Sequence, residues 1–463
     1  MFIMSIFKGR FGAQAQPLTQ GPIARRILTF AMPLFLGQLL QQLYNLADAW
    51  VLGNFAPEEA FAAVSSGGSL TFLVTGFFNG VAIGGSVIIS RYFGAKDEEN
   101  VTRAIHNNFL FGLIVSVLST VAGLLIAPWL LGIMNTPENV LPYSLTYFRI
   151  YFGGVSTVIL YNICMAIMRA LGDSIHPLYY LAISSLLNVV LDLLFVAVLP
   201  WGVAGAAIAT ILTQGISVIL CLLRMCRLKD FTRLDFRKLR LHPDLMRQVM
   251  SQGLPTGVQN AVISIGNLVI QSNINSFQEH AMAGQGAYAR IEGVVFLPIM
   301  SISMALTTFI SQNLGAREYD RAKKGAVFGI ISGVAMAELV GVLFLLFAPL
   351  ALRVFVDSEE ALAFGVTHVR IAAPFYFLLA FSHCAAGVMR GCGKAIVPMI
   401  SMLSFWCVVR VIYVTTALHF FPEVYALIPW AYPLTWSLSS LLFLLFLLKS
   451  DWLHAFDIGK HQS

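Results

Sequence analysis

Long apolar stretches recur along the whole chain of 463 residues, and they constrain its fold more than any other feature. Hydrophobic residues make up 58% of the chain and charged residues only 11%, which is about half the charge of an ordinary soluble domain. Such stretches cross a hydrocarbon core of about 30 Å as helices, because each backbone polar group in lipid needs a partner within the protein. The sequence therefore predicts an all-α integral membrane protein.

The apolar windows predict twelve transmembrane helices, each long enough to span the membrane at about 1.5 Å per residue. They lie near residues 27–52, 61–90, 104–132, 142–168, 177–199, 203–224, 249–276, 286–311, 325–347, 362–388, 395–419 and 425–448. The segments expected from these windows are an N-terminal segment (1–26), an N-lobe (27–224), a linker (225–248), a C-lobe (249–448) and a tail (449–463).

Lysine and arginine gather in the N-terminal segment, the linker and alternate loops, whereas the opposite loops carry mainly aspartate and glutamate. By the positive-inside rule, both termini are expected in the cytoplasm, and the protein in the inner or plasma membrane. Residues 1–26 contain no convincing cleavage site, so the first span should remain as an anchor. The net charge of +6 belongs to these loops and does not indicate nucleic-acid binding. The six cysteines lack metal-ligand spacing, and no disulfides are expected.

The two halves of the chain repeat each other at a constant offset. "IISRYFGAKDEE" (88–99) matches "FISQNLGAREYD" (309–320) at a shift of 221, and Met168-Arg169 matches Met389-Arg390 at the same shift. Pro33 pairs with Pro255 at a shift of 222. Six helices per repeat is an even number, so the halves enter the membrane in the same sense and form a parallel repeat. Transporters of this kind place the substrate path between their halves; the alternative is a duplicated membrane enzyme or receptor without transport.

Polar side chains form a stripe on the first span, at spacings of 3, 4 and 3 residues: Gln38, Gln41, Asn45 and Asp48, with Gln42 beside them. These spacings place them on one face of a helix, which must face protein or water rather than lipid. Hydrogen bonding between helices is one explanation. Five polar side chains ending in a carboxylate favour the other, the wall of a cavity.

The fifth span carries an asparagine and an aspartate one helical turn apart, Asn188 and Asp192, in the apolar run "SLLNVVLDLLFVAVLP". Asp192 lies about 22 Å, and Asp48 about 31 Å, from the cytoplasmic start of its span. The i,i+4 pair Ala206 and Thr210 on the sixth span lies at a similar depth. We therefore expect these five residues to meet in the outer half of one bundle.

This set of oxygen ligands suits a hard cation such as Na⁺. It equally suits a proton, because carboxylates that are desolvated and close together readily hold one. A structural, hydrogen-bonded aspartate pair is the alternative.

The C-terminal half repeats the scaffold without these acids. Its seventh span has a polar stripe of Asn260, Ser264, Asn267 and Gln271. The counterparts of Asp48 and Asp192 are Ile270 and Tyr413. Glu338 is the one deep acid predicted in this half; it either belongs to a second substrate or proton site or pairs with Arg410. Arg290 and Glu292 are interpreted as interfacial.

Motifs for ATP hydrolysis and for common enzyme chemistry are absent from the sequence. The nearest approach to a P-loop, "RGCGKAI" (390–396), lacks the upstream glycine and has Ala395 in the hydroxyl position. No HExxH or GxSxG occurs, and the nine histidines show no ligand spacing. We expect no enzymatic activity and no cofactor, so transport would have to be driven by an ion gradient.

The chain resembles the multidrug and toxic compound extrusion (MATE) family, in its DinF-like or MepA-like branch. The resemblance covers residues 25–448 and rests on "PLFLGQLLQQLYNLADAWVLG", the paired "GAK" and "GAR" loops, "MRALGDSIHP" with "MRGCGKAIVP", and "LNVVLDLLFV". It implies twelve helices in two six-helix lobes arranged as a V, with substrate exchanged for Na⁺ or H⁺.

The resemblance also implies roles for particular residues. In DinF-like members a cation site is formed by side chains that correspond here to Asp48, Asn188, Asp192 and Thr210, together with the Ala206 carbonyl. Pro33 matches a proline at which the first helix bends in some members. The NorM-like branch uses acids on the seventh and tenth helices, where this chain has none within the membrane.

The sequence thus predicts an antiporter that exports amphipathic, cationic drugs or metabolites in exchange for H⁺ or Na⁺, by alternating access between two lobes. The substrate-cavity candidates are Gln38, Gln41, Gln42, Asn45, Asn260, Asn267, Gln271 and Glu338. Its expected partners are small amphipathic substrates and membrane lipids, and it is expected to be a monomer. The alternatives are a flippase for a lipid-linked precursor and a non-transporting receptor or enzyme.

Overall fold

The computed structural model describes residues 17–133 and 138–456, and every regular element in those ranges is helical. The first half contains α2 (Ile23–Phe55), α3 (Glu58–Gly94), α4 (Glu98–Ile133), α5 (Leu141–Gly153), α6 (Val155–Ala170), α7 (Ile175–Asp192), η1 (Leu193–Val198) and α8 (Gly202–Arg227). A short helix, η2 (Phe236–Lys238), lies in the linker. The second half contains α9 (Pro243–Asn275), α10 (Gln278–Gly315), α11 (Tyr319–Leu352), α12 (Glu359–Ala372), η3 (Ala373–Phe375), α13 (Tyr376–Gly391), α14 (Ile396–Met402), η4 (Leu403–Val409), α15 (Arg410–Phe420) and α16 (Leu427–Lys449).

Each of the twelve predicted spans corresponds to one helical rod. Within the described residues, ten helices are long and apolar enough to cross a membrane, and α5 with α6, bent by 45° at their junction, makes an eleventh. The twelfth rod is α9, which has 33 residues but carries a polar stripe that lowers its hydropathy. The prediction of an all-α membrane fold is confirmed.

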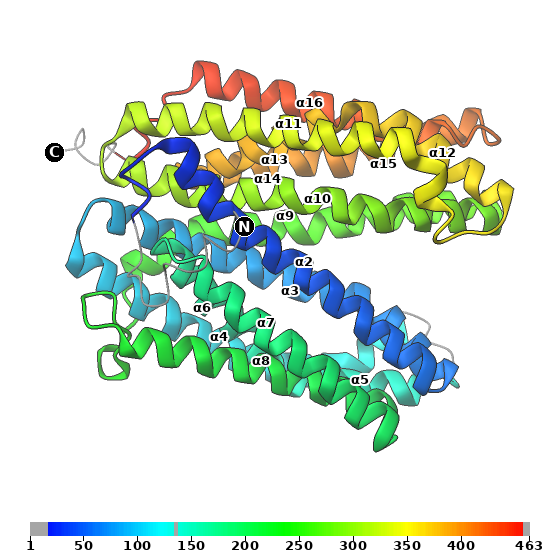
Figure 1. Ribbon diagram of the computed structural model, residues 1–463, viewed down its shortest axis with the longest axis horizontal. Helices are drawn as coiled ribbons and strands as arrows, with labels where there is room; N and C mark the ends of the chain where they lie inside the picture. Colours follow the sequence, from blue (N-terminus) through cyan, green and yellow to red (C-terminus); the bar gives the residue numbers. More distant parts are fainter. Residues whose placement is uncertain (1–16, 134–137, 457–463) are drawn as a thin grey trace, which may run out of the picture.

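The helices form two lobes that meet at one end of the molecule and diverge toward the other, as a V (Figure 1). Helices α3 to α8 surround one apolar core, and α10 to α16 surround another. We call the end that carries Leu18, the linker and Phe456 the terminal end, and the opposite end the far end.

Helix α2 belongs to both lobes. Near the terminal end its residues Ile27, Phe30 and Leu34 pack into the apolar core of the second half. Toward the far end it packs along α7 and η1 of the first half. The helix stays continuous through the buried Pro33. A change in the far part of α2 is therefore transmitted to both lobes through a single rod.

Glycines bring the two lobes into backbone contact where α3 crosses α9. A Cβ atom on Gly80 would lie 2.4 Å from the Gly257 nitrogen, and one on Gly84 would lie 2.3 Å from the Gly253 nitrogen. Only glycine permits so close a crossing. The GxxxG spacing on α3 is therefore used between lobes, as close helix packing in membranes requires.

The paired GAK and GAR loops also meet between the lobes. A Cβ atom on Gly94 would lie 1.9 Å from the Gln312 carbonyl oxygen, and one on Gly315 would lie 2.0 Å from the Arg91 carbonyl oxygen. These contacts are reciprocal: each repeat presents its glycine to the equivalent carbonyl of the other. The sequence repeat is thus expressed as an approximate twofold contact at the terminal end.

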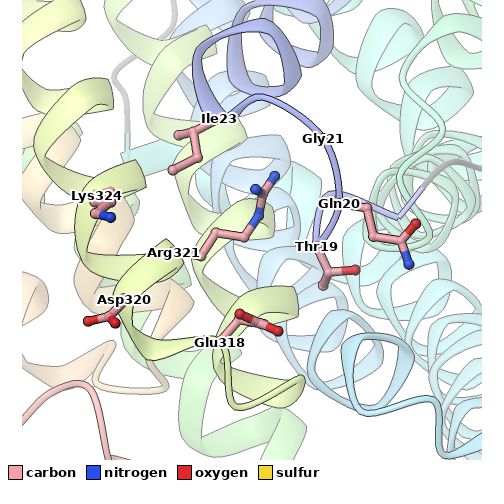
Figure 2. A pocket seen from close by; sticks show the side chains of 8 residues that line it. All are labelled: Thr19, Gln20, Gly21, Ile23, Glu318, Asp320, Arg321 and Lys324. Atoms are coloured by element: carbon pink, nitrogen blue, oxygen red, sulfur yellow. The ribbon is translucent and has the colours of Figure 1, made fainter.

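The N-terminal segment and the tail close the same end. The Leu18 amide donates to Gln312 Oε1 (2.8 Å), and Arg321 donates to the Leu18 carbonyl. A hollow of about 450 Å³ lies beside this contact, with Arg321 reaching toward the segment (Figure 2). The tail contacts the first lobe, where the Arg91 guanidinium carbon lies 4.3 Å from the centre of the Phe456 ring.

The linker between the lobes is attached to α4. Thr102 donates to the Phe231 carbonyl, the Asp235 amide donates to His106 Nε2, and the His242 amide donates to Asn107 Oδ1. The linker is therefore held on the first lobe.

Candidate functional site

Asn188 and Asp192 lie on the buried face of α7, and α7 gives way to the π-helix η1 immediately after Asp192. Asp192 is 0% exposed and Asn188 is 1% exposed, yet no side-chain nitrogen or oxygen of either residue has a hydrogen-bond partner among the described residues. Buried polar groups are ordinarily satisfied, so such a pair indicates a binding site for something small. A π-segment beside it is a frequent feature of functional sites.

Helix α2 brings a second carboxylate to the same place. Asp48 lies near the far end of α2, and its Oδ1 atom is buried without a partner in the described part of the chain. Asp48 and Asp192 are close enough to interact electrostatically. The structure thus brings together the two acids that the sequence places 144 positions apart.

Helix α8 forms the third side of the site. Ala206 is buried against Val51, Leu52 and Val196, which belong to α2 and η1. Thr210, one turn further along α8, lies beside the Tyr44 hydroxyl of α2. Close approach of α8 to η1 depends on Gly205, where a Cβ atom would lie 2.9 Å from the Phe195 carbonyl oxygen.

Three tyrosines belong to this site and were missed by the sequence analysis. Tyr44 interacts electrostatically with both aspartates, and so does Tyr147 of α5. Tyr147 stacks on Tyr151 one turn later, with ring centroids 6.0 Å apart. Tyr147 and Tyr151 lie four residues apart in an apolar helix, and this spacing could have indicated a polar face there.

The site therefore combines carboxylate, amide and hydroxyl groups from α2, α5, α7 and α8. No lysine, arginine or histidine is among the groups that interact with Asp48 or Asp192 in the described residues. Such an all-oxygen, anionic set can hold a hard cation or a proton.

The residues of the two polar stripes differ in what they contact. Gln38 Nε2 donates to Met304 Sδ (3.4 Å) and Asn260 Nδ2 donates to the Gly76 carbonyl (2.9 Å), so both join the lobes. Asn45 donates to Gln42, and Gln271 donates to Asn275. Ser264 donates to the Asn260 carbonyl one turn earlier. Gln41 and Asn267 are exposed.

Of the two alternatives for Glu338, the pairing with Arg410 is wrong. Arg410 is 3% exposed and donates to Thr435 Oγ1, and the carboxylate that interacts with it is that of Glu292. Glu338 lies instead at the backbone of Phe377, at the start of α13. The interpretation of Glu292 as interfacial is also wrong, because its carboxylate accepts a hydrogen bond from the buried Tyr288. Helix rotation, which the sequence does not reveal, decides which acid faces Arg410.

The MatE family model matches residues 33–194 and 255–415, so its two copies begin at the paired prolines Pro33 and Pro255. The probable multidrug resistance protein YpnP of Bacillus subtilis is 30% identical over 394 residues, which cover 85% of this chain and 88% of that protein. The probable multidrug resistance protein NorM of Thermotoga maritima is 24% identical over an alignment that covers 87% of this chain and 86% of that protein. A FAD transporter of Shewanella oneidensis is 26% identical over an alignment that covers 68% of this chain and 70% of that protein.

Solved structures share the fold. The outward-facing structure of a MATE family transporter of the MOP superfamily superposes with a TM-score of 0.89 at 22% identity, covering 97% of this chain and 100% of that one. A MOP superfamily transporter from Pyrococcus furiosus superposes with a TM-score of 0.87 at 22% identity, with 95% and 98% covered. Both halves of the chain match the family model and a relative at 30% identity aligns over most of its length, so the chain belongs to the MatE family of membrane transporters, the multidrug and toxic compound extrusion proteins.

Proposed function

We propose that this protein is a secondary active antiporter that exports amphipathic, cationic compounds and takes up H⁺ or Na⁺ in exchange. The observation that carries the proposal is the pair of aspartates, Asp48 and Asp192, whose buried oxygens have no partner in the described residues. Two carboxylates in an apolar lobe are costly unless a cation or proton joins them. The names of relatives as multidrug resistance proteins support export of drug-like compounds.

The terminal end is proposed to face the cytoplasm, because the basic loops and the linker lie there. The lobes would then be closed toward the cytoplasm and apart toward the outside. In the return state the α3–α9 crossing would separate and the far ends would approach each other. Rocking of two halves around a substrate path between them is the usual motion of parallel-repeat transporters.

Cation binding would act on this motion through α2. A cation bound between Asp48 and Asp192 offsets their mutual repulsion and draws α2 toward α7 and α8. Because the other end of α2 is packed in the second lobe, the same movement alters the contact between lobes. A ligand shifts such an equilibrium only by its difference in affinity for the two states.

Substrate would lie between the lobes, against apolar surface and the exposed amides Gln41, Asn45 and Asn267. Promiscuous sites combine apolar lining with a few polar groups. The protein is proposed to act as a monomer surrounded by lipid.

The test is efflux of a cationic dye from proteoliposomes under an imposed pH gradient or an imposed Na⁺ gradient, each applied alone. One gradient should drive efflux by the wild-type protein, and Asp192→Asn should reduce it to the rate of protein-free liposomes. Glu99→Gln is the matched control, because Glu99 is an exposed acid paired with Arg103 on the surface. Wild-type efflux rates in Asp192→Asn would refute the assignment of this site.

A further inference from the structure

A second cluster of buried polar groups lies in the other lobe, away from the aspartates. The Tyr376 and Tyr288 hydroxyls are 3.2 Å apart, and the Tyr288 hydroxyl donates to Glu292 Oε1 at 2.7 Å. Both tyrosines are fully buried, whereas Glu292 is half-buried. A chain of hydroxyls thus runs from inside the lobe to the Glu292 carboxylate.

Arg410 supplies a positive charge to this cluster without forming a direct ion pair. Its guanidinium donates to Thr435 Oγ1 at 2.8 and 3.2 Å and lies 4.4 Å from the centre of the Tyr432 ring. It interacts electrostatically with Glu292, but no salt bridge within 4.0 Å joins the two in the described residues. Aromatic faces stabilise a desolvated cation. Arg410 can therefore stay charged whether or not Glu292 is ionised.

His368 is the unexplained member of the cluster. It is 0% exposed and its ring stacks on Tyr288 with centroids 3.9 Å apart. Neither ring nitrogen has a hydrogen-bond partner among the described residues. A buried imidazole with two open positions, beside a hydroxyl chain and a carboxylate, indicates a place where a proton or a water molecule is held.

We propose that Glu292, with Tyr288 and His368, forms a second proton-binding site in this lobe. The Glu292 carboxylate binds the proton, and the hydroxyl chain and the open nitrogens of His368 hold a water molecule or proton behind it. A metal cation is disfavoured, because the Arg410 charge repels it. The site does not depend on Asp48 and Asp192 and lies on helices α10, α12 and α15, outside the first lobe.

The groups that face this site come from every helix packed around it. They are Tyr288 and Glu292 of α10, His368 of α12, Tyr376 of α13, Cys407 of η4, Arg410 of α15 and Tyr432 of α16, while α11 presents the Phe344 ring. With Glu292 ionised, its charge balances that of Arg410. With Glu292 protonated, the Arg410 charge is no longer balanced by Glu292, which would weaken binding of a cationic substrate nearby.

Infrared difference spectroscopy of the full-length protein during pH titration tests this proposal, because the carbonyl stretch of a protonated carboxyl reports the proton directly. The background is Asp48→Asn with Asp192→Asn, so that the first site contributes no signal. Surface carboxyls, which hydrogen-bond to water, absorb at lower frequency than a carboxyl shielded from water. A pH-dependent band at the higher frequency of a shielded carboxyl should remain in this background. Glu292→Gln should abolish it, and Glu338→Gln, the other deep acid of the lobe, should leave it in place.

Persistence of the band in Glu292→Gln, or its loss in Glu338→Gln, would overturn the proposal. If Glu292→Gln does not fold, Tyr288→Phe serves instead, because it keeps the ring and removes the hydrogen bond to Glu292. That variant should move the pH at which the band appears, and an unchanged titration would contradict the assignment. The result is independent of the efflux test, which probes the aspartates of the first lobe.

Discussion

Asp192 buries a carboxylate that has no hydrogen-bond partner among the described residues and lies near a second carboxylate. An unsatisfied buried polar group costs about 1–3 kcal/mol, and functional residues often carry such a cost. Asparagine has the same shape and removes the charge. We therefore expect the free energy of unfolding of Asp192→Asn to equal or exceed that of the wild type by up to about 1–3 kcal/mol, even though transport is lost.

Thermal unfolding of the purified proteins in Na⁺ and in K⁺ at equal ionic strength measures this effect. A ligand that binds only the folded state raises its stability in proportion to the logarithm of its concentration. If Na⁺ is the coupling ion, the wild type should be stabilised by Na⁺ and Asp192→Asn should not respond. A clear loss of stability in Asp192→Asn would mean that the carboxylate is structural.

Helix packing between the lobes depends on backbone contact along α3. A Cβ atom at Gly84 would collide with the Gly253 nitrogen, and backbone cannot move aside as a side chain does. We expect Gly84→Ala to push α3 and α9 apart and to cost about 1–3 kcal/mol, which is typical of overpacking. The decrease in unfolding temperature gives the measurement.

Gly76→Ala is the matched control on the same helix. A Cβ atom there would meet the Asn260 Cβ atom at 3.7 Å, which is ordinary contact. This variant should unfold at the wild-type temperature. Equal effects of the two substitutions would show that the crossing tolerates a methyl group, contrary to the glycine contacts described above.

At the scale of the whole molecule, Gln312 ties three separate parts of the chain together. Its fully buried amide donates to the Ala170 carbonyl of the first lobe (2.8 Å) and accepts from the Leu18 amide of the N-terminal segment. Gln312→Ala removes both contacts. We expect it to raise the population of molecules whose lobes are apart at the terminal end.

Distances between spin labels at Glu99 and Lys324, exposed positions on the two lobes, report this population. The labelled protein also needs Cys226 and Cys407 replaced, because these two cysteines are not fully buried. Gln312→Ala should increase the long-distance fraction. Gln20→Ala, an exposed amide in the same N-terminal segment, should leave the distribution unchanged. An unchanged distribution in Gln312→Ala would show that the remaining contacts between the lobes, such as the glycine crossings and the Asn260–Gly76 hydrogen bond, are enough to hold the lobes together.

Sequence reasoning succeeded where the information is local or periodic. Hydropathy predicted the spans, a constant offset predicted the repeated lobes, and helical spacing predicted that Asn188 and Asp192 share a buried face. Depth along the spans predicted that Asp48 would lie near them, and the structure brings Asp48 and Asp192 together. The apolar windows also found α9, although its stripe of amides makes it more polar than the other spans.

The rotation of one helix relative to another could not be predicted from the sequence. Depth and spacing do not tell whether Glu292 or Glu338 faces Arg410, and the alternative with Glu338 was wrong. For the same reason Tyr147 and Tyr151 were not recognised beside the aspartates, although their spacing was visible. Asn260 appeared to be a cavity residue and instead bonds to Gly76 of the other lobe.

By itself, the sequence determined that this is a two-lobed helical membrane protein with two acids inside the spans of its first lobe, because burial in lipid imposes length, apolarity and period on every span. Only the tertiary structure decided which polar groups meet. Each side chain points from its helix in a known direction relative to its neighbours in sequence, but the helix is free to rotate until packing against other helices settles what that side chain faces. For this chain, that packing left Asp192 and His368 buried without partners.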